Sequence, residues 1–166
     1  MAIRTEPAAA LQGWLAIPGR IEKALDGLAE ADLDLRGGEA QWSIRETVHH
    51  LVEANLVASN IIIAGLGKSG CIYDWSWLWP NTAWNQRLGY GTAAVRPALD
   101  TLRALCEQIA GLIRTHTDGF QREVQLLDSP DAKLYTRTIT DILLQEIKHV
   151  DEHLPSVAEI RAAHAR

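Results

Sequence analysis

The sequence has little of what marks secreted, membrane-spanning or nucleic-acid-binding proteins. Its 166 residues include two cysteines, Cys71 and Cys106, too few for a disulfide framework, so we expect free thiols in a reducing compartment. The N-terminal segment has no continuous apolar run of the kind found in signal peptides. No stretch approaches the roughly 20 apolar residues needed to cross a membrane. These absences predict a cytoplasmic protein that does not contact the membrane.

The balance of charge excludes a class of partner. The net charge is −5 and no basic run occurs, whereas binding to a nucleic-acid backbone requires clustered lysine and arginine. Apolar residues make up 47% of the chain and charged residues 22%, which is typical of a folded globular protein and not of a disordered one. We therefore expect one folded domain over residues 1–166 that does not bind nucleic acid.

Four segments show the three- and four-residue spacing of apolar residues that indicates amphipathic helices. They cover roughly residues 19–31, 44–64, 94–115 and 140–159. Pro18 and Pro97 are expected in the first turn of their helices, where the missing N–H is tolerated, and Pro155 is expected to kink the last helix. Four such helices in one chain predict an all-α fold, a four-helix bundle of either simple or crossover topology.

Local signals define the start of the second helix and the contents of two long connections. Ser43 followed three residues later by Glu46 is a capping box, in which each side chain bonds to the backbone N–H of the other residue. The connection over residues 67–91 is long enough for a functional loop or for short structure of its own. Before the last helix, residues 123–127 and 134–136 flank a Ser-Pro-Asp sequence and predict a small hairpin.

The last predicted helix carries two histidines four residues apart, His149 and His153. Residues at this spacing lie on one face of a helix, so both imidazoles can point toward a single transition-metal ion. His50, near the apolar face of the second predicted helix, could be a third ligand if the two helices are neighbours. The alternative is that these are surface histidines with no common role. Glu53 and Glu146, each one turn from a histidine, could orient or join the ligands, or lie on a solvated helix face.

A second metal-site hypothesis uses a different set of residues. The sequence contains two Glu-x-x-His pairs, one ending at His49 and one at His149. Two such pairs with two further glutamates define the carboxylate-bridged dimetal bundles, and Glu22 and Glu107 could complete that set. This arrangement leaves His153 without a role, so we rank it second.

Two sets of residues together carry a family resemblance. They are Trp42-Ser43-x-x-Glu46-x-x-x-His50-Leu51 and His149-x-x-x-His153. The combination resembles the DinB-like family, the YfiT/DinB four-helix bundles, and matches it in helix order and length over nearly the whole chain. It implies one divalent metal ion, zinc or nickel, bound by His50, His149 and His153. Three imidazoles leave a position for water or substrate, and such a centre can lower the pKa of bound water to about 7 or hold a thiolate.

The same resemblance implies a function. Relatives include transferases and isomerases that use low-molecular-weight thiols, as well as proposed hydrolases. We therefore expect a metal-dependent enzyme that acts on a small-molecule substrate, with a thiol cosubstrate if it is a transferase, and family grounds favour the transferase. A metal-binding or stress-response protein without catalysis is the third reading. Family members are often dimers, so a homodimer is also expected.

Four tryptophans in the first long connection admit three roles. Trp75, Trp77, Trp79 and Trp84 could wall a hydrophobic pocket over the metal. They could form a dimer contact, where aromatic residues are enriched, or simply close one end of the bundle. The sequence alone does not choose between these roles.

Overall fold

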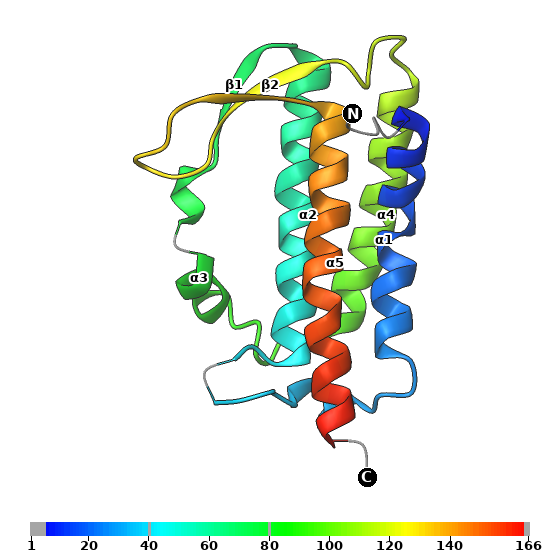
Figure 1. The fold of residues 1–166 in the computed structure, drawn as a ribbon, viewed down its shortest axis with the longest axis vertical. Coiled ribbons are helices and arrows are strands. Elements are labelled where there is room, and N and C mark those ends of the chain that lie inside the picture. The colour runs from blue at the N-terminus through cyan, green and yellow to red at the C-terminus, as the bar shows by residue number, and fades with distance from the viewer. Residues whose placement is uncertain (1–5, 40, 80, 165–166) are drawn as a thin grey trace, which may run out of the picture.

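The computed structural model describes residues 6–39, 41–79 and 81–164. Its body is a bundle of four long helices, as the sequence predicts (Figure 1). These are α1 (Pro7–Leu25), α2 (Ile44–Gly67), α4 (Val95–Arg114) and α5 (Ile139–His164). The connections hold the 3₁₀ turns η1 (Glu30–Asp34) and η2 (Ser76–Leu78), the short helix α3 (Asn81–Arg87), and the strands β1 (Cys71–Asp74), β2 (Glu123–Leu127) and β3 (Tyr135–Thr138).

The bundle has a crossover topology. In Figure 1, α1 and α5 run downward, whereas α2 and α4 both run upward, so the connection between α2 and α4 returns along the length of the bundle. Helices α1 and α2 each pack against both α4 and α5. Because α2 and α5 are antiparallel neighbours, side chains on their facing sides can meet. The three-histidine hypothesis requires this arrangement.

The first helix begins earlier than the predicted range of 19–31. α1 includes the stretch before Pro18, so Pro18 lies inside the helix and not in its first turn. Its missing N–H and its ring disfavour this position, but Pro18 is buried and Trp14, one turn before it, is 0% exposed. Packing of this face therefore outweighs the local preference. The helix ends at Leu25, just before Gly27, whose φ of 79° lies in the left-handed region that glycine adopts freely.

The other long helices start within one residue of the prediction. α2 begins at Ile44 directly after its cap, and it extends to Gly67, three residues past the predicted end. α5 begins at Ile139 and continues through Pro155 to His164. Pro155 therefore lies inside the last helix, and the kink expected there stays a prediction.

A three-stranded sheet at the upper end of the bundle is an addition to the predicted all-α fold (Figure 1). β2 and β3 pair antiparallel, with Glu123 opposite Thr138, so the predicted hairpin is confirmed. β1 lies parallel to the other edge of β2, with Cys71 opposite Val124. The sheet packs on α2 where Gly65 has no side chain, because a Cβ there would stand 2.6 Å from Val124 Cγ2.

α2 is the most deeply packed helix around the site. By length and composition it alone among the described helices could cross a membrane, but 61% of that window is buried in the bundle, as in the core helix of a folded protein. Leu56 and Ile63, two large apolar residues of this helix, are 37% and 42% exposed, whereas His49, His50 and Glu53 are buried. A buried polar group costs free energy unless it has a partner. His50, whose buried Nδ1 has no hydrogen-bond partner, therefore points to a site.

Candidate metal centre

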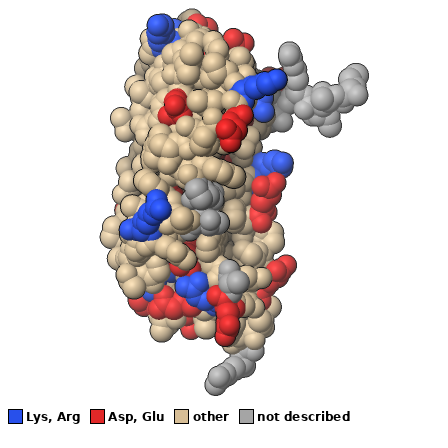
Figure 2. All heavy atoms as spheres, turned by 90° about the vertical axis from the view of Figure 1, so that its left-hand side faces the viewer, with Lys and Arg blue, Asp and Glu red and all other residues tan. Residues whose placement is uncertain are grey.

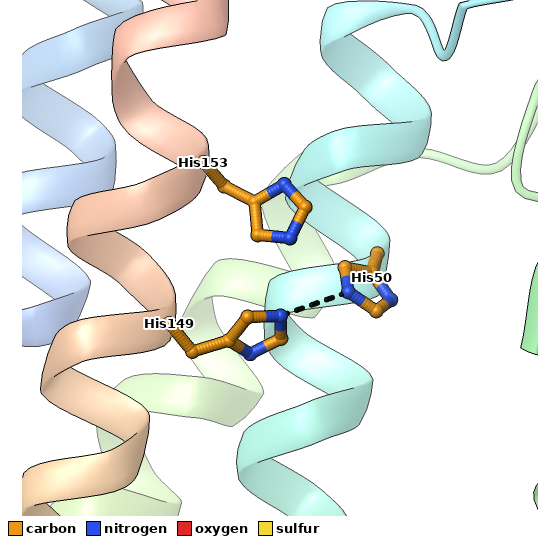
Figure 3. A group of neighbouring side chains, drawn as sticks. All are labelled: His50, His149 and His153. Atoms are coloured by element: carbon orange, nitrogen blue, oxygen red, sulfur yellow. Dashed lines mark hydrogen bonds between the residues drawn. The ribbon is translucent and has the colours of Figure 1, made fainter.

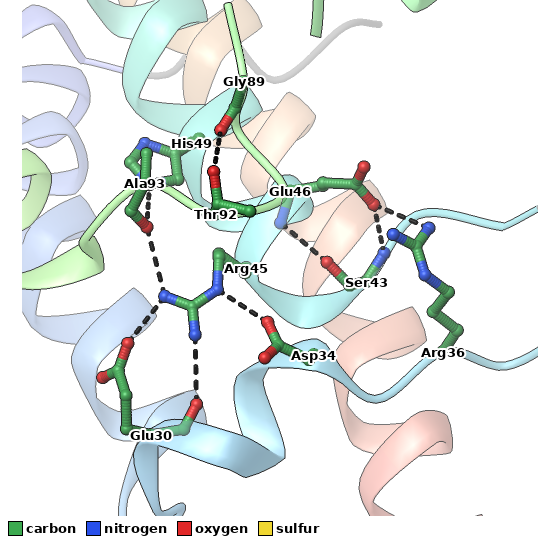
Figure 4. Close-up of polar contacts among 10 residues, drawn as sticks. All are labelled: Glu30, Asp34, Arg36, Ser43, Arg45, Glu46, His49, Gly89, Thr92 and Ala93. Atoms are coloured by element: carbon green, nitrogen blue, oxygen red, sulfur yellow. Dashed lines mark hydrogen bonds and ion pairs between the residues drawn. The ribbon is translucent and has the colours of Figure 1, made fainter. Parts of the chain in front are cut away.

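The first turn of α2 is fixed by the predicted capping box (Figure 4). Ser43 Oγ accepts the N–H of Glu46 at 3.1 Å, and the Glu46 carboxylate accepts the N–H of Ser43 at 2.8 Å. Arg36 pairs with the same carboxylate at 2.7 Å. Burial works to raise the pKa of Glu46, but the bonds from Ser43 and Arg36 outweigh it and lower the pKa. Glu46 is therefore an ionised structural group, as expected from its capping role.

A buried arginine ties two other segments to this turn (Figure 4). Arg45 is 5% exposed, and its guanidinium donates to the carboxylates of Glu30 at 2.6 Å and Asp34 at 2.7 Å. It also donates to the backbone carbonyls of Glu30 and Ala93, each at 3.1 Å. These bonds hold η1 and the chain before α4 against α2, which fixes the register of the helix around His50.

The imidazoles of His50, His149 and His153 point toward one another between α2 and α5 (Figure 3). The Nε2 atoms of His50 and His149 are 3.1 Å apart, and one candidate ligand atom from each of the three residues lies within 4.8 Å of the others. Two nitrogen ligands on one tetrahedral zinc ion are about 3.3 Å apart. Among the described residues this is the single group of three or more His, Cys, Asp or Glu side chains with such spacing. The predicted convergence of these histidines is therefore present.

The surroundings of His50 and His153 favour the neutral imidazole, which is the form that binds metal ions. Burial, together with repulsion from His149 and His153, lowers the pKa of His50 to about 3. Burial also lowers the pKa of His153. The Nδ1 atom of His50 is buried with no hydrogen-bond partner. Three imidazole nitrogen donors in one place fit zinc, nickel or a similar divalent ion.

The two acids expected beside the ligands have different surroundings. A Glu146 carboxylate oxygen lies 3.6 Å from Nδ1 of His149, and this oxygen is buried without a hydrogen-bond partner. Glu53 is 8% exposed, and Trp84 and Tyr90 are its hydrogen-bond partners. Burial raises the pKa of Glu53, and these two bonds offset part of the shift. Glu146 thus lies beside the imidazole of His149, whereas Glu53 lies in the pocket wall next to the cluster.

The dimetal alternative has no site among the described residues. His49 Nε2 donates to the carbonyl of Ala93 at 3.1 Å, and its ring stacks on Tyr90 with the centroids 4.9 Å apart. The glutamate of its Glu-x-x-His pair is held by the capping box. Glu22, a third expected member, pairs with Arg103 at 2.5 Å. These groups lie in separate places, so the structure favours the three-histidine centre.

A pocket of about 220 Å³ opens onto this centre. Two of the clustered histidines, His50 and His149, lie at one end with Glu53 and Glu146, and the pocket follows the groove between α2 and α5 toward the sheet. Apolar side chains dominate its middle. The remaining lining residues are Ala54, Val57, Ala58, Ile61, Trp75, Leu78, Leu126, Tyr135, Arg137, Asp141, Ile142 and Gln145.

The tryptophan-rich connection contributes to this pocket, but only in part. Trp75 lines it together with Leu78, and the buried indole N–H of Trp75 has no hydrogen-bond partner. Trp84 packs edge-on against Trp77, with ring centroids 5.3 Å apart. Trp77 and Trp79 are 58% and 62% exposed and do not line the pocket. The expectation of an aromatic wall therefore holds for Trp75.

Sequence reasoning missed three residues near the centre. The Trp42 ring lies 4.6 Å from that of His50 and 6.1 Å from that of His153, centroid to centroid, and Trp42 and His153 both line a second hollow beside the cluster. The position of Trp42 directly before the helix cap could have indicated that it packs near the first turns of α2. Tyr135 and Arg137 line the first pocket from β3. No local signal could have found them.

These features define a class of protein: a four-helix bundle of crossover topology with three converging histidines at the end of a pocket. The family model of the DinB superfamily matches residues 15–156. The chain therefore belongs to this superfamily.

Among solved structures, the chain is similar to one described as "YfiT from Bacillus subtilis is a probable metal-dependent hydrolase with an unusual four-helix bundle topology". The TM-score is 0.81, and the two chains share 21% sequence identity over 98% of this chain and 90% of the other. This likeness shows a common fold. Comparison with curated protein sequences gives no match.

Proposed function

We propose that this protein is a metal-dependent hydrolase in which His50, His149 and His153 hold one divalent ion, zinc or nickel. The observation that carries the proposal is that the pocket opens directly on two of these histidines, with Glu53 and Glu146 at the same end. A closed structural metal site has no need of such an opening. When bound, the ion supplies Lewis-acid chemistry, because it polarises a carbonyl or phosphoryl group and lowers the pKa of water.

The side chains around the centre supply orientation, proton transfer and a dry wall. Glu146 lies beside Nδ1 of His149 and orients this ligand. Glu53 faces the pocket, and its pKa is raised toward neutral pH. A carboxylate with such a pKa is suited to take a proton from water and to return it to a leaving group. Trp75 and Leu78 cover the pocket and limit the access of bulk water.

Hydrolysis joins water to a single organic substrate. The pocket that reaches His50 and His149 gives such a substrate a place to bind. The similar structure is described as that of a probable metal-dependent hydrolase, which agrees with this assignment. Thiol transfer is the second candidate, because a second hollow meets the cluster at His153 and Trp42. Two reactants, one of them a low-molecular-weight thiol, could then approach the centre from different sides.

The first test is the metal content of protein purified without a polyhistidine tag. We expect about one ion per chain in the wild type. His50→Ala should lose it, whereas the matched variant His49→Ala should keep it, because His49 bonds to Ala93 and not to the cluster. Retention of metal in His50→Ala, or equal loss in both variants, would contradict the three-histidine centre.

The second test is turnover by the metal-loaded protein. We expect hydrolysis within a panel of esters and amides, reduced about 10²-fold in Glu53→Gln with unchanged metal content. Turnover that requires an added thiol and an electrophile, without hydrolysis, would assign the transferase instead. Full metal content with neither activity would indicate a metal-binding protein without catalysis.

A further inference from the structure

The pocket has two chemically different ends. The lining residues extend along both α2 and α5, which are antiparallel. His50 and His149 lie at one end of the pocket, and Ile61 and Asp141 lie at the other. The eight-residue step from Asp141 to His149 corresponds to about 12 Å along a helix. Between the two ends the walls are mainly apolar, with Trp75 over them. A molecule that fills the pocket is therefore elongated and apolar in its middle.

A single permanent cation lies at the end away from the histidines. Among the described residues that line the pocket, Arg137 is the only lysine or arginine. It lies on β3 just before α5, and Tyr135 is two residues away on the same face of the strand. The guanidinium carbon is 4.9 Å from the centroid of the Tyr135 ring, and the Tyr135 hydroxyl donates to Asp128 at 3.0 Å. The ring thus supports the guanidinium at the rim of the pocket.

Within the described part of the chain, the exposed guanidinium of Arg137 faces the Tyr135 ring and donates one N–H to the carbonyl of Thr136 at 3.4 Å. No carboxylate there lies within 4.0 Å of its guanidinium, in contrast to Arg45 and Arg103. Asp141, the acid at the same end of the pocket, accepts the N–H and the hydroxyl of Thr138 at 2.9 and 2.8 Å. The planar fork of an arginine binds a carboxylate through two parallel hydrogen bonds. Arg137 therefore has donors for a ligand.

The surroundings make this a local feature and not part of a general basic surface. On the face that carries the sheet and α3, basic side chains lie singly among acidic and uncharged ones (Figure 2). Such a face does not attract polyanions. A single cation at the end of an apolar pocket instead selects a small ligand with one anionic group.

We propose that the substrate is an amphipathic monoanion whose terminal carboxylate binds Arg137 while its reacting group lies at the histidine cluster. The apolar middle of the molecule lies against Val57, Ala58 and Leu78. This inference rests on the proposed function, because the histidine cluster supplies the reacting end. If the rise of α5 from Asp141 to His149 is taken as the length of the pocket, the carboxylate and the reacting group of the substrate are about 12 Å apart.

Two matched hydroxamates test the inference on zinc-loaded protein. Octanohydroxamate and suberic acid monohydroxamate carry the same zinc-binding group, and only the second ends in a carboxylate. By isothermal titration calorimetry we expect suberic acid monohydroxamate to bind about tenfold more tightly. Arg137→Gln should abolish this preference and leave the Kd of octanohydroxamate unchanged. Arg114→Gln, an exposed arginine in the last turn of α4 outside the pocket, should preserve the preference.

The outcomes separate this inference from the proposed function. The shorter glutaric acid monohydroxamate cannot span about 12 Å, so its carboxylate should give no gain that depends on Arg137. Equal affinity of the two eight-carbon probes for the wild type, or a preference that survives in Arg137→Gln, would overturn the inference while zinc-dependent binding still supported the metal centre. Absence of zinc-dependent binding for both probes would overturn the proposed centre as well.

Discussion

Replacing Gly65 by alanine tests how closely β2 packs on α2 over the pocket. Alanine is favoured over glycine inside a helix by about 1 kcal/mol, so helix propensity alone predicts a more stable protein. The added Cβ, however, would lie 2.6 Å from Cγ2 of Val124, which is 0% exposed and has no open space to move into. Overpacking of this kind costs about 1–3 kcal/mol. The free energy of unfolding should therefore fall by about 0–2 kcal/mol.

Gly111→Ala is the matched control for this prediction. Gly111 lies in α4, and a Cβ there would meet nothing within 4 Å, so the change should raise the free energy of unfolding by up to about 1 kcal/mol. Urea titrations with equal m values would measure both effects, and we expect the two variants to differ by about 1–3 kcal/mol. If Gly65→Ala stabilises the protein as much as Gly111→Ala does, the close packing of the sheet on α2 is refuted.

Three further changes test the structure around the site. Arg45→Met should lower the free energy of unfolding by about 2–4 kcal/mol, because two backbone carbonyls lose a buried donor together with two ion pairs; an unchanged urea midpoint would contradict the anchoring role. Ser43→Ala should cost about 1 kcal/mol in the same assay, and Ser43→Asp, which can also cap a helix, should recover most of it. Burial raises the pKa of Cys106 to about 12, so in a Cys71→Ser background its labelling by iodoacetamide should stay slow from about pH 7 to 9, where an exposed thiol becomes thiolate. Labelling of the native protein as fast as in urea would show that this thiol is not buried.

The features that the sequence predicted well depend on interactions between residues close together along the chain. The start of α2 followed from Ser43 and Glu46, whose mutual hydrogen bonds involve residues three apart. The histidine cluster followed from the four-residue spacing of His149 and His153 together with the position of His50 near the apolar face of α2. That the three side chains meet also required α2 and α5 to be neighbours, which helix periodicity permitted but could not establish.

The features that were missed depend on contacts between distant segments. Pro18 was predicted in a first turn because local rules disfavour proline inside a helix, but burial of the surrounding face decides the outcome in α1. β1 pairs with β2 across the whole of α4, and nothing in either short segment encodes its partner. Because Arg137 reaches the pocket only through that sheet, its role at the site could not be read from the sequence.

The tryptophans near the centre allow binding at the site to be followed by intrinsic fluorescence. Trp42 lies against the rings of His50 and His153, and the indole of Trp75 lines the pocket, whereas Trp14 is sealed inside the bundle. An ion or ligand that enters the centre therefore changes the surroundings of two of the six tryptophans, Trp42 and Trp75, whereas Trp14 stays unchanged inside the bundle and the other three lie outside the pocket lining. Occupancy of the site can thus be followed in the protein's own fluorescence, without a label and before any substrate has been identified.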